Sequence, residues 1–556
     1  MSADRSKPLS ERAIVATALV AALVAIAILL GLQSLADGSD SPLGEDLAEQ
    51  IPPDAFVAGV AERWIEAWEV SDVGAMQELA VPPAEDLAER VSSFVDGLRV
   101  TALRASPRTP VVTEDRATVT LDVAVDLRGL GTWTFVTRLP LVLAPDAANP
   151  ADWRVEWSRA VLHPELTGSN RLAVTRQFAP RAALLAADGS PLTGPLVGRV
   201  ATAESDGEHR LLGDPVGVSG LHAAFDLELG GTASGEVQVV DAAGAPLRVL
   251  DRIEGRAPAP VQTSLDPRIQ AIVDGQLSGL DKPAAMVVIR PSTGEVVAVG
   301  NNPPNGFNRA LNGRYPPGST FKIVTSTALL ANGTTPDSPA SCPEIATING
   351  RDFRNAEGAA LGDIPFRRAF FESCNTAFVQ LAADLEAADL VAAAGRFGFN
   401  AAPGIELPAE TSSFPEPHSI VDQASASIGQ GRVAATPLQM ATVAATVASG
   451  THRSTTLRKV TSPEAGTPLP DGIAATLQEL MRLVVEQGTG TAAQLPPPPV
   501  HGKTGTAEFG TDKPPRTHAW FVGFRGDLAL AVVVEDSGFG GVVAAPIARE
   551  VFRQAG

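Results

Sequence analysis

Cysteine, histidine and basic runs are all scarce in this chain of 556 residues, and each shortage excludes a class of function. Its two cysteines, Cys342 and Cys374, are too few for a disulfide framework and lack the spacing of a metal site. The seven histidines are scattered, so we expect no metal centre. A formal charge of −20, with no basic run after residue 12, argues against nucleic-acid binding.

One apolar run stands out near the N-terminus. Residues 13–32 carry no charge, and about 20 helical residues are enough to cross a bilayer. Three basic residues precede the run within residues 1–12, and four acidic residues follow it within residues 37–46. The positive-inside rule therefore predicts a cytoplasmic tail (1–12), a single-pass anchor in the cell membrane (13–36) and an extracytoplasmic remainder. A cleaved signal peptide stays open, because Ser34–Ala36 is a small-x-small triplet.

After a short linker (37–52), the chain reads as a small α+β domain over residues 53–162. Apolar residues at helical spacing predict a helix from Asp54 to Trp68, and a second helix follows at Ala84–Leu98. The next segments alternate apolar and polar residues and predict strands, at Ala117–Leu127, Thr132–Leu143 and Trp153–Trp157. Because the domain contains no catalytic constellation, we interpret it as a scaffold or spacer.

The rest of the chain divides once more. Residues 163–258 combine short β-type runs with turn signals, and they predict a mostly β pedestal. Beyond Pro258–Pro260, helix and strand patterns alternate to the C-terminus, so residues 259–556 form the domain that carries the chemistry. The fold class predicted for the whole chain is α+β and multidomain, with an N-terminal transmembrane helix.

The first chemical motif is Ser319-Thr320-Phe321-Lys322. Pro316-Pro317-Gly318 ends one element before it, and an apolar helical run follows, so Ser319 is expected at a helix N-terminus. Residues three apart lie above one another on a helix, so Lys322 can reach the Ser319 hydroxyl. A serine needs an adjacent base to act as a nucleophile, and a lysine with a lowered pKa can serve.

Two further motifs follow at a distance. Ser373-Cys374-Asn375 lies in a helix-rich stretch, and Lys503-Thr504-Gly505-Thr506 reads as a strand with residues 520–524 and 528–534 as sheet neighbours. Alone, S-x-x-K and S-x-N are weak signals, and K-T-G is a moderate one. All three in this order match the trio of penicillin-binding proteins and class A β-lactamases.

With these motifs in place, residues 262–556 resemble the transpeptidase domain of a class B penicillin-binding protein. The supporting phrases are YPPGSTFKIVTS, ESCNTAFVQLA, SIGQGRVAATPLQMA, HGKTGTAEF and HAWFVGF. Residues 53–162 resemble the nuclear-transport-factor-like domain of methicillin-resistance-type members. Residues 163–258 resemble their pedestal, or dimerisation domain, although the entry motif is altered to RAALLAADGSPLTG. The resemblance implies a serine transpeptidase/β-lactamase-like α/β fold with a central antiparallel sheet.

The resemblance also implies a catalytic role for five residues. Ser319 would attack the carbonyl between the two D-alanines of a peptidoglycan stem peptide and become an acyl-ester. Lys322 would take its proton, and Ser373 with Lys503 would relay a proton towards the leaving amine. Asn375 would orient the substrate amide. No metal or organic cofactor is implied.

The third motif would bind the substrate. By the same resemblance, the hydroxyls of Thr504 and Thr506, on either side of Gly505, would bind the terminal carboxylate. Backbone N–H groups of Ser319 and Thr506 would form the oxyanion hole. The phrase Gly429-Gln430-Gly431 would lie near the cleft, and we assign it no chemical role.

Several alternatives stay open at this point. A serine β-lactamase or β-lactam sensor, a D,D-carboxypeptidase and a non-catalytic cell-wall scaffold would each fit part of the pattern. The expected partners are stem peptides, β-lactam antibiotics, the cytoplasmic membrane and cell-wall synthesis proteins such as a glycosyltransferase. Whether Cys342 and Cys374 form a disulfide outside the cell stays open, since sequence gives no Cα separation.

Overall fold

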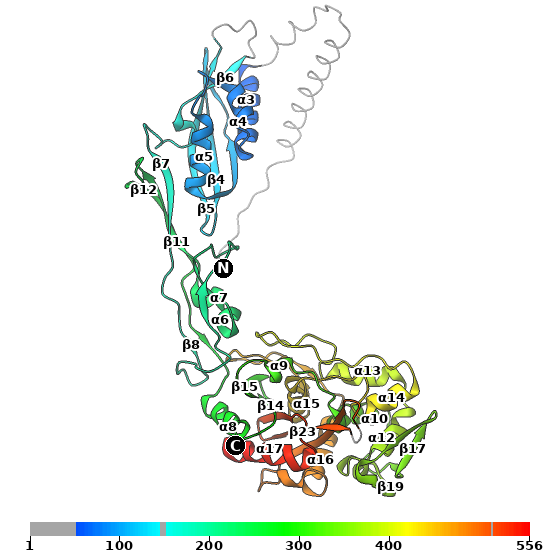
Figure 1. Ribbon diagram of the computed structural model, residues 1–556. Helices are drawn as coiled ribbons and strands as arrows, with labels where there is room; N and C mark the ends of the chain where they lie inside the picture. The colour runs from blue at the N-terminus through cyan, green and yellow to red at the C-terminus, as the bar shows by residue number, and fades with distance from the viewer. Residues whose placement is uncertain (1–51, 145–151, 513–514) are drawn as a thin grey trace, which may run out of the picture. The chain divides into compact units, whose positions relative to one another are not determined.

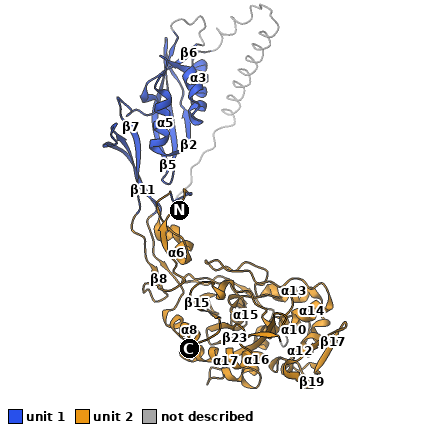
Figure 2. Ribbon diagram, in the orientation of Figure 1, with its two compact units in different colours: residues 1–178, 207–211, 232–256 blue, residues 179–206, 212–231, 257–556 orange. Residues whose placement is uncertain are grey.

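The computed structural model describes residues 52–144, 152–512 and 515–556, which divide into two compact units (Figures 1 and 2). Unit 1 draws its residues from 1–178, 207–211 and 232–256, and unit 2 contains 179–206, 212–231 and 257–556. The predicted anchor lies outside the described residues. Within the part of the chain that the structure describes, no helix is long and apolar enough to cross a membrane.

Among its described residues, unit 1 contains three helices and a six-stranded sheet with the order β1-β6-β5-β4-β2, in which β3 also pairs with β4. Both predicted helices and all three predicted strands are confirmed, within a few residues at their ends. Helix α4 and strands β1, β2 and β3 were not predicted. The elements are α3 (Pro53–Glu69), α4 (Val73–Leu79), α5 (Leu87–Leu98), β1 (Ala80–Val81), β2 (Val100–Pro107), β3 (Val111–Thr113), β4 (Arg116–Leu127), β5 (Gly131–Leu143), β6 (Trp153–Glu156) and the 3-10 turn η1 (Arg159–Val161).

The segment predicted as a separate pedestal contributes to both units. Strands β7 (Arg171–Gln177), β11 (Ser234–Val240) and β12 (Pro246–Ile253) form an antiparallel sheet whose Leu172 and Val237 join the hydrophobic core of unit 1. The remaining elements belong to unit 2: β8 (Leu184–Leu185), β9 (Val200–Thr202), β10 (Pro215–Gly217), α6 (Gly220–Ala224), α7 (Asp226–Gly230) and β13 (Val261–Gln262). The division into three domains stays a prediction.

A five-stranded sheet with the order β15-β14-β24-β23-β22 forms the centre of unit 2, and every neighbouring pair in it is antiparallel. Strands β14 and β24 are buried along almost their whole length, because helices α8 and α17 cover one face and α15 packs on the other. Strand β22 lies at the edge. The elements are β14 (Ala284–Arg290), β15 (Glu295–Asn302), β22 (His501–Phe509), β23 (Arg516–Arg525), β24 (Leu528–Val534), α8 (Pro267–Ser278), α15 (Pro437–Ser449) and α17 (Gly540–Ala555).

A helical region of unit 2 lies beside this sheet, yellow-green in Figure 1, and it carries two of the three motifs. Two short antiparallel strand pairs are part of it: β17–β18, and β16–β19, whose two strands enclose β17 and β18 in the chain. The remaining elements of unit 2 are α9 (Arg309–Asn312), η2 (Gly318–Phe321), α10 (Lys322–Ala331), β16 (Pro339–Cys342), β17 (Ile345–Ile348), β18 (Arg351–Arg354), η3 (Ala356–Gly358), β19 (Gly362–Pro365), α11 (Phe366–Phe371), α12 (Asn375–Ala383), α13 (Ala387–Arg396), α14 (Ile420–Ser427), β20 (Thr451–His452), β21 (Thr467–Pro468), α16 (Ile473–Glu486) and η4 (Thr491–Ala493).

Candidate active site

Ser319 lies at the N-terminus of a helical segment, as predicted, and the first turn of that segment is a 3-10 helix. It belongs to η2, and α10 continues directly from it at Lys322. The Thr320 hydroxyl donates to the Pro317 carbonyl at 2.7 Å and closes the turn. A Cβ placed on Gly318 would lie 3.1 Å from the Thr506 carbonyl oxygen. Half-buried Ser319 therefore lies in a turn packed against strand β22.

Two glycines make this close approach possible. A Cβ on Gly505 would lie 2.8 Å from Thr320 Cγ2, so the strand needs glycine there to pack against the turn. Gly429 has φ +69°, and its carbonyl accepts the Gly318 N–H at 3.0 Å, while a Cβ on it would lie 2.2 Å from the Gly318 oxygen. The Gly429-Gln430-Gly431 phrase, which the sequence left without a chemical role, thus supports the turn of Ser319.

Lys322 is completely buried and its amine contacts the second motif. Its Nζ lies 2.7 Å from the Ser373 carbonyl oxygen, 2.7 Å from Asn375 Oδ1 and 3.3 Å from Ser373 Oγ. Burial, reinforced by the charge of Lys503, lowers the pKa of Lys322 well below its usual value. This shift favours the neutral amine, which is the form of Lys322 that can accept a proton. The predicted contact with the Ser319 hydroxyl is absent among the hydrogen bonds of the described residues.

Lys503 is also completely buried, and its amine contacts the same Ser373 hydroxyl as Lys322 does. Its Nζ lies 2.8 Å from Ser373 Oγ and 3.1 Å from the Thr504 carbonyl oxygen. Burial lowers the pKa of Lys503 to about 7, so both protonation states are populated near neutral pH. An ammonium at Lys503 donates to Ser373 Oγ, which leaves the Ser373 O–H free to point at a neutral Lys322. The chain Lys503–Ser373–Lys322 can therefore carry a proton.

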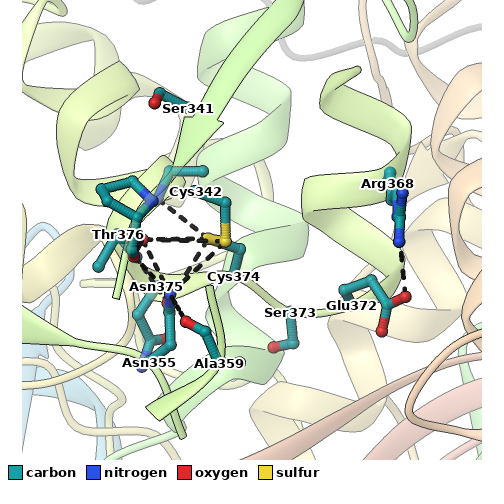
Figure 3. The surroundings of a disulfide bond; sticks show 12 residues. Ser341, Cys342, Asn355, Ala359, Arg368, Glu372, Ser373, Cys374, Asn375 and Thr376 are labelled. Atoms are coloured by element: carbon teal, nitrogen blue, oxygen red, sulfur yellow. Dashed lines mark hydrogen bonds and ion pairs between the residues drawn. A yellow bond between two sulfur atoms is a disulfide. The ribbon is translucent and has the colours of Figure 1, made fainter. Parts of the chain in front are cut away.

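The second motif occupies the turn between α11 and α12. Ser373 has φ +61°, a strained value for a residue with a side chain, and α12 starts two residues later at Asn375. Asn375 Nδ2 donates to the Arg354 carbonyl at 3.0 Å. Cys374 is bonded to Cys342 in a disulfide with a Cα separation of 6.2 Å, as Figure 3 shows, which resolves the question that the sequence left open.

The third motif lies on β22, as predicted, and its hydroxyls already have neighbours. Thr504 Oγ1 lies 2.6 Å from Thr489 Oγ1, and the Gly540 N–H donates to Thr506 Oγ1 at 3.4 Å. Thr489 gave no signal in the sequence, because its 14-residue distance from Lys503 matches no local periodicity. Since β22 is an edge strand, one side of its backbone can pair with an extended ligand.

The structure thus brings Lys322, Ser373, Asn375 and Lys503 into one hydrogen-bonded cluster, and it packs the turn of Ser319 against the strand that carries Lys503. Across residues 52–144, 152–512 and 515–556, no group of three or more His, Cys, Asp or Glu side chains could hold a metal ion. What the arrangement can perform is serine-based acyl transfer with lysine as the base.

Two family profiles match the sequence. The penicillin binding protein transpeptidase domain matches residues 284–553, and the NTF2-like N-terminal transpeptidase domain matches residues 58–170. The first profile covers the whole central sheet and all three motifs, and the second covers most of unit 1.

Curated relatives match a little more than half of this chain. The chain is 34% identical to the peptidoglycan D,D-transpeptidase PbpA of Mycobacterium tuberculosis over 381 residues, 55% of this chain and 75% of the relative. It is 35% identical to PbpA of Mycolicibacterium smegmatis over 369 residues, 54% of this chain and 74% of the relative.

Solved structures share the fold. The structure of Pseudomonas aeruginosa PBP2 matches with a TM-score of 0.56 at 24% identity, over 69% of this chain and 96% of that one. A chain from a peptidoglycan synthase complex that coordinates polymerization and crosslinking matches with a TM-score of 0.59 at 25% identity, over 70% and 92% of the two chains.

Proposed function

This chain belongs to the penicillin-binding protein transpeptidases, and we propose that it cross-links peptidoglycan stem peptides through an acyl-ester on Ser319. It is a peptidoglycan D,D-transpeptidase, as its family and its relatives indicate. The observation that carries the assignment of roles is the hydrogen-bonded chain Lys503–Ser373–Lys322, which lies beside the turn of Ser319.

The proposed reaction is an acyl transfer in two halves. Ser319 Oγ attacks the carbonyl between the two D-alanines while the neutral amine of Lys322 takes the hydroxyl proton. The C–N bond then breaks, and the proton reaches the leaving D-Ala amine through Ser373 and Lys503. In the second half, an amine of another stem peptide attacks the ester, forms the cross-link and returns the proton that regenerates Ser319.

Strand β22 would hold the donor peptide. We assign the terminal carboxylate to the hydroxyls of Thr504 and Thr506, with Gly505 between them, because both side chains project from the edge strand of the sheet. The backbone N–H groups of Ser319 and Thr506 would stabilise the tetrahedral oxyanion. Asn375, which is held against Lys322, would orient the substrate amide.

The proposed setting is the outer face of the cytoplasmic membrane. Support comes from the uncharged run of residues 13–32 and the charge asymmetry around it, which favour a single-pass anchor over residues 13–36. The similarity to a chain of a peptidoglycan synthase complex supports work alongside other cell-wall synthesis proteins, a glycosyltransferase among them. β-Lactams would acylate Ser319 in place of the stem peptide.

A fluorescent penicillin tests the nucleophile directly. The chain from residue 38 onward is incubated with the drug, and the adduct is followed by gel and by intact mass, with Ser319→Ala as the control. A stable adduct on the wild type alone is the expected result. A D-Ala-D-Ala substrate with an added acceptor amine then separates cross-linking from carboxypeptidase hydrolysis.

Other outcomes would change the conclusion. Drug consumed without a lasting adduct would identify a β-lactamase. Intact drug together with an unreacted D-Ala-D-Ala substrate would identify a scaffold that lacks activity.

A further inference from the structure

The turn that carries Ser373 and Asn375 needs support from outside itself. Ser373 adopts a left-handed φ of +61°, and such a residue persists only where the surrounding structure holds it. Its carbonyl and hydroxyl oxygens both contact Lys322 Nζ, so a small movement of this turn would separate the two lysines from their shared hydroxyl. The contacts that fix the first residues of α12 therefore also fix the catalytic turn.

Asn355 supplies most of them. Its Oδ1 accepts the backbone N–H of Thr376 at 3.0 Å, and its Nδ2 donates to the carbonyls of Pro343 and Ala359 at 2.9 and 2.8 Å. The Thr376 hydroxyl lies 3.0 Å from Asn355 Nδ2 and itself donates to the Pro343 carbonyl at 2.7 Å. Asn355 is only 8% exposed, so few solvent molecules compete for these bonds.

The contacts of Asn355 lie in register with those of the catalytic motif. Arg354 accepts a hydrogen bond from the Asn375 side chain through its carbonyl, and the next residue, Asn355, binds the next residue of α12, Thr376. Two consecutive residues of one segment therefore hold two consecutive residues of the other. Figure 3 shows Asn355 and Thr376 on the same side of the disulfide, next to Asn375.

The disulfide cannot replace this arrangement. It ties Cys374 to Cys342 at one point, whereas the orientation of the first turn of α12 also depends on Thr376, two residues further along. An amide that accepts from one backbone group and donates to two others fixes a direction as well as a position.

We infer that Asn355 is a positioning residue for the reaction, whose side-chain amide fixes the first turn of α12 and thereby holds Ser373 and Asn375 against the two lysines. This inference rests on the function proposed for Ser319. Asn355 itself touches neither the nucleophile nor, in this assignment, the substrate. Its effect passes through the residues that it holds.

Asn355→Ala tests the inference, and Gln478→Ala is its matched control. Gln478 also donates to two backbone carbonyls of unit 2, those of Val447 and Ala448, but it lies outside the site. We expect Asn355→Ala to lower the rate constant of penicillin acylation roughly 10- to 100-fold, because a shift of about 1 Å in a catalytic group costs that much. Gln478→Ala should leave this rate constant within about twofold of the wild type. It should lower the thermal midpoint by about as much as Asn355→Ala does.

The pH profile separates positioning from general weakening. Asn375 Oδ1 accepts from Lys322, and an acceptor stabilises an ammonium more than an amine, so losing it lowers the pKa of Lys322 further. The acidic limb of acylation should then move to lower pH in Asn355→Ala. Asn355→Ala should lower the acylation rate less in a protein that already carries Asn375→Ala than in the wild type. The reason is that Asn355 acts partly through Asn375, so the two losses are not additive. An unmoved acidic limb together with full additivity would overturn the inference.

Two further measurements keep the test decisive. Asn355→Asp retains the acceptor for Thr376 but loses both donors, so it serves if Asn355→Ala does not fold, and it should show an intermediate loss. Reduction of the Cys342–Cys374 disulfide by dithiothreitol needs no activity, and it should be at least about tenfold faster in the Asn355 variants than in Gln478→Ala, since both sulfurs are buried beside the amide. Equal reduction rates would overturn the inference even if the wild type failed to bind penicillin, a failure that would concern the proposed function alone.

Discussion

The two units treat buried polar groups in opposite ways. The core of unit 1 is built on large aromatic side chains, among them Trp64, Trp68 and Phe94, and its ion pairs, such as Arg108–Asp122, lie at the surface. The core of unit 2 contains Lys322 and Lys503, both completely buried, and neither has an ion pair among the described residues. Each unit has a hydrophobic core of its own.

This difference indicates what each unit is built for. Burying an amine without a carboxylate is unfavourable, and the lowered pKa of both lysines expresses that cost. A protein keeps such an arrangement where the chemistry requires it. Unit 1 also buries a titratable side chain, His163, whose pKa burial lowers to about 4, but none of its described residues is a lysine, which supports a scaffold role for it. Four substitutions, taken from the largest expected effect to the smallest, probe this contrast.

Lys322→Met removes the buried amine and should have the largest effect. Loss of a general base lowers the rate about 10²- to 10⁴-fold, so penicillin acylation should fall by a factor in that range. The thermal midpoint should stay the same or rise, because an apolar side chain replaces a poorly solvated one. Lys459→Met, at an exposed position of the same unit, is the control and should change neither quantity. Acylation within tenfold of the wild type would remove Lys322 from the mechanism.

Trp68→Ala should show the reverse pattern in unit 1. The side chain is 1% exposed, and truncating a buried tryptophan costs about 3–5 kcal/mol of unfolding free energy. Tryptophan fluorescence can report the transition, because five of the six tryptophans lie in unit 1. Glu66→Ala, on the exposed side of α3, should leave the transition in place. Acylation at a temperature below the transition should be unchanged, and a parallel loss of acylation would contradict a purely supporting role for unit 1.

The third effect is a pH dependence at Lys503, where the acylation rate and the free energy of unfolding should change in opposite directions. If the ammonium of Lys503 is the active form, acylation falls about tenfold per pH unit above its pKa of about 7. Stability should move the other way. Between about pH 7 and 10 the unfolded chain binds more protons at this lysine than the folded one, so the free energy of unfolding rises with pH.

Lys503→Arg provides the control for this prediction. An arginine keeps its charge throughout the range, so the alkaline fall in acylation should disappear from the variant. The rise of the unfolding free energy with pH should lose the share of Lys503 and keep only that of Lys322, whose pKa burial also lowers. An alkaline limb that persists in Lys503→Arg would assign the titration to another group.

The sequence predicted the motifs and their elements better than the contacts between them. The strand that carries Lys503 follows from a local pattern, and it is confirmed as β22, paired with β23. The partners of Lys322 are Ser373 and Asn375, 51 and 53 residues away, whereas spacing alone pointed to Ser319. Local periodicity describes one helix, but it carries no information on which distant turn will pack against it.

The residues that the sequence missed share this cause. Asn355 and Thr489 each act through a contact with a distant segment. Nothing in their immediate neighbours distinguishes them from ordinary loop residues. The disulfide was left open for the same reason, because the separation between the two Cα atoms is a tertiary quantity.

Arg108→Ala should have the smallest effect of the four substitutions, although it removes an ion pair with two short hydrogen bonds. Two hydrogen bonds, at 2.8 and 2.6 Å, join the guanidinium to Asp122 across strands of unit 1, and they lower the pKa of that carboxyl. Both side chains are about half exposed, however, so water and salt screen the attraction and ordering the two groups offsets much of the rest. We expect no measurable shift of the thermal midpoint in Arg108→Ala, Asp122→Ala or the double variant, whether in 10 mM or 1 M NaCl. A coupling as large as the loss in Trp68→Ala would mean that unit 1 depends on its surface charges, and the contrast between the two units would then no longer hold.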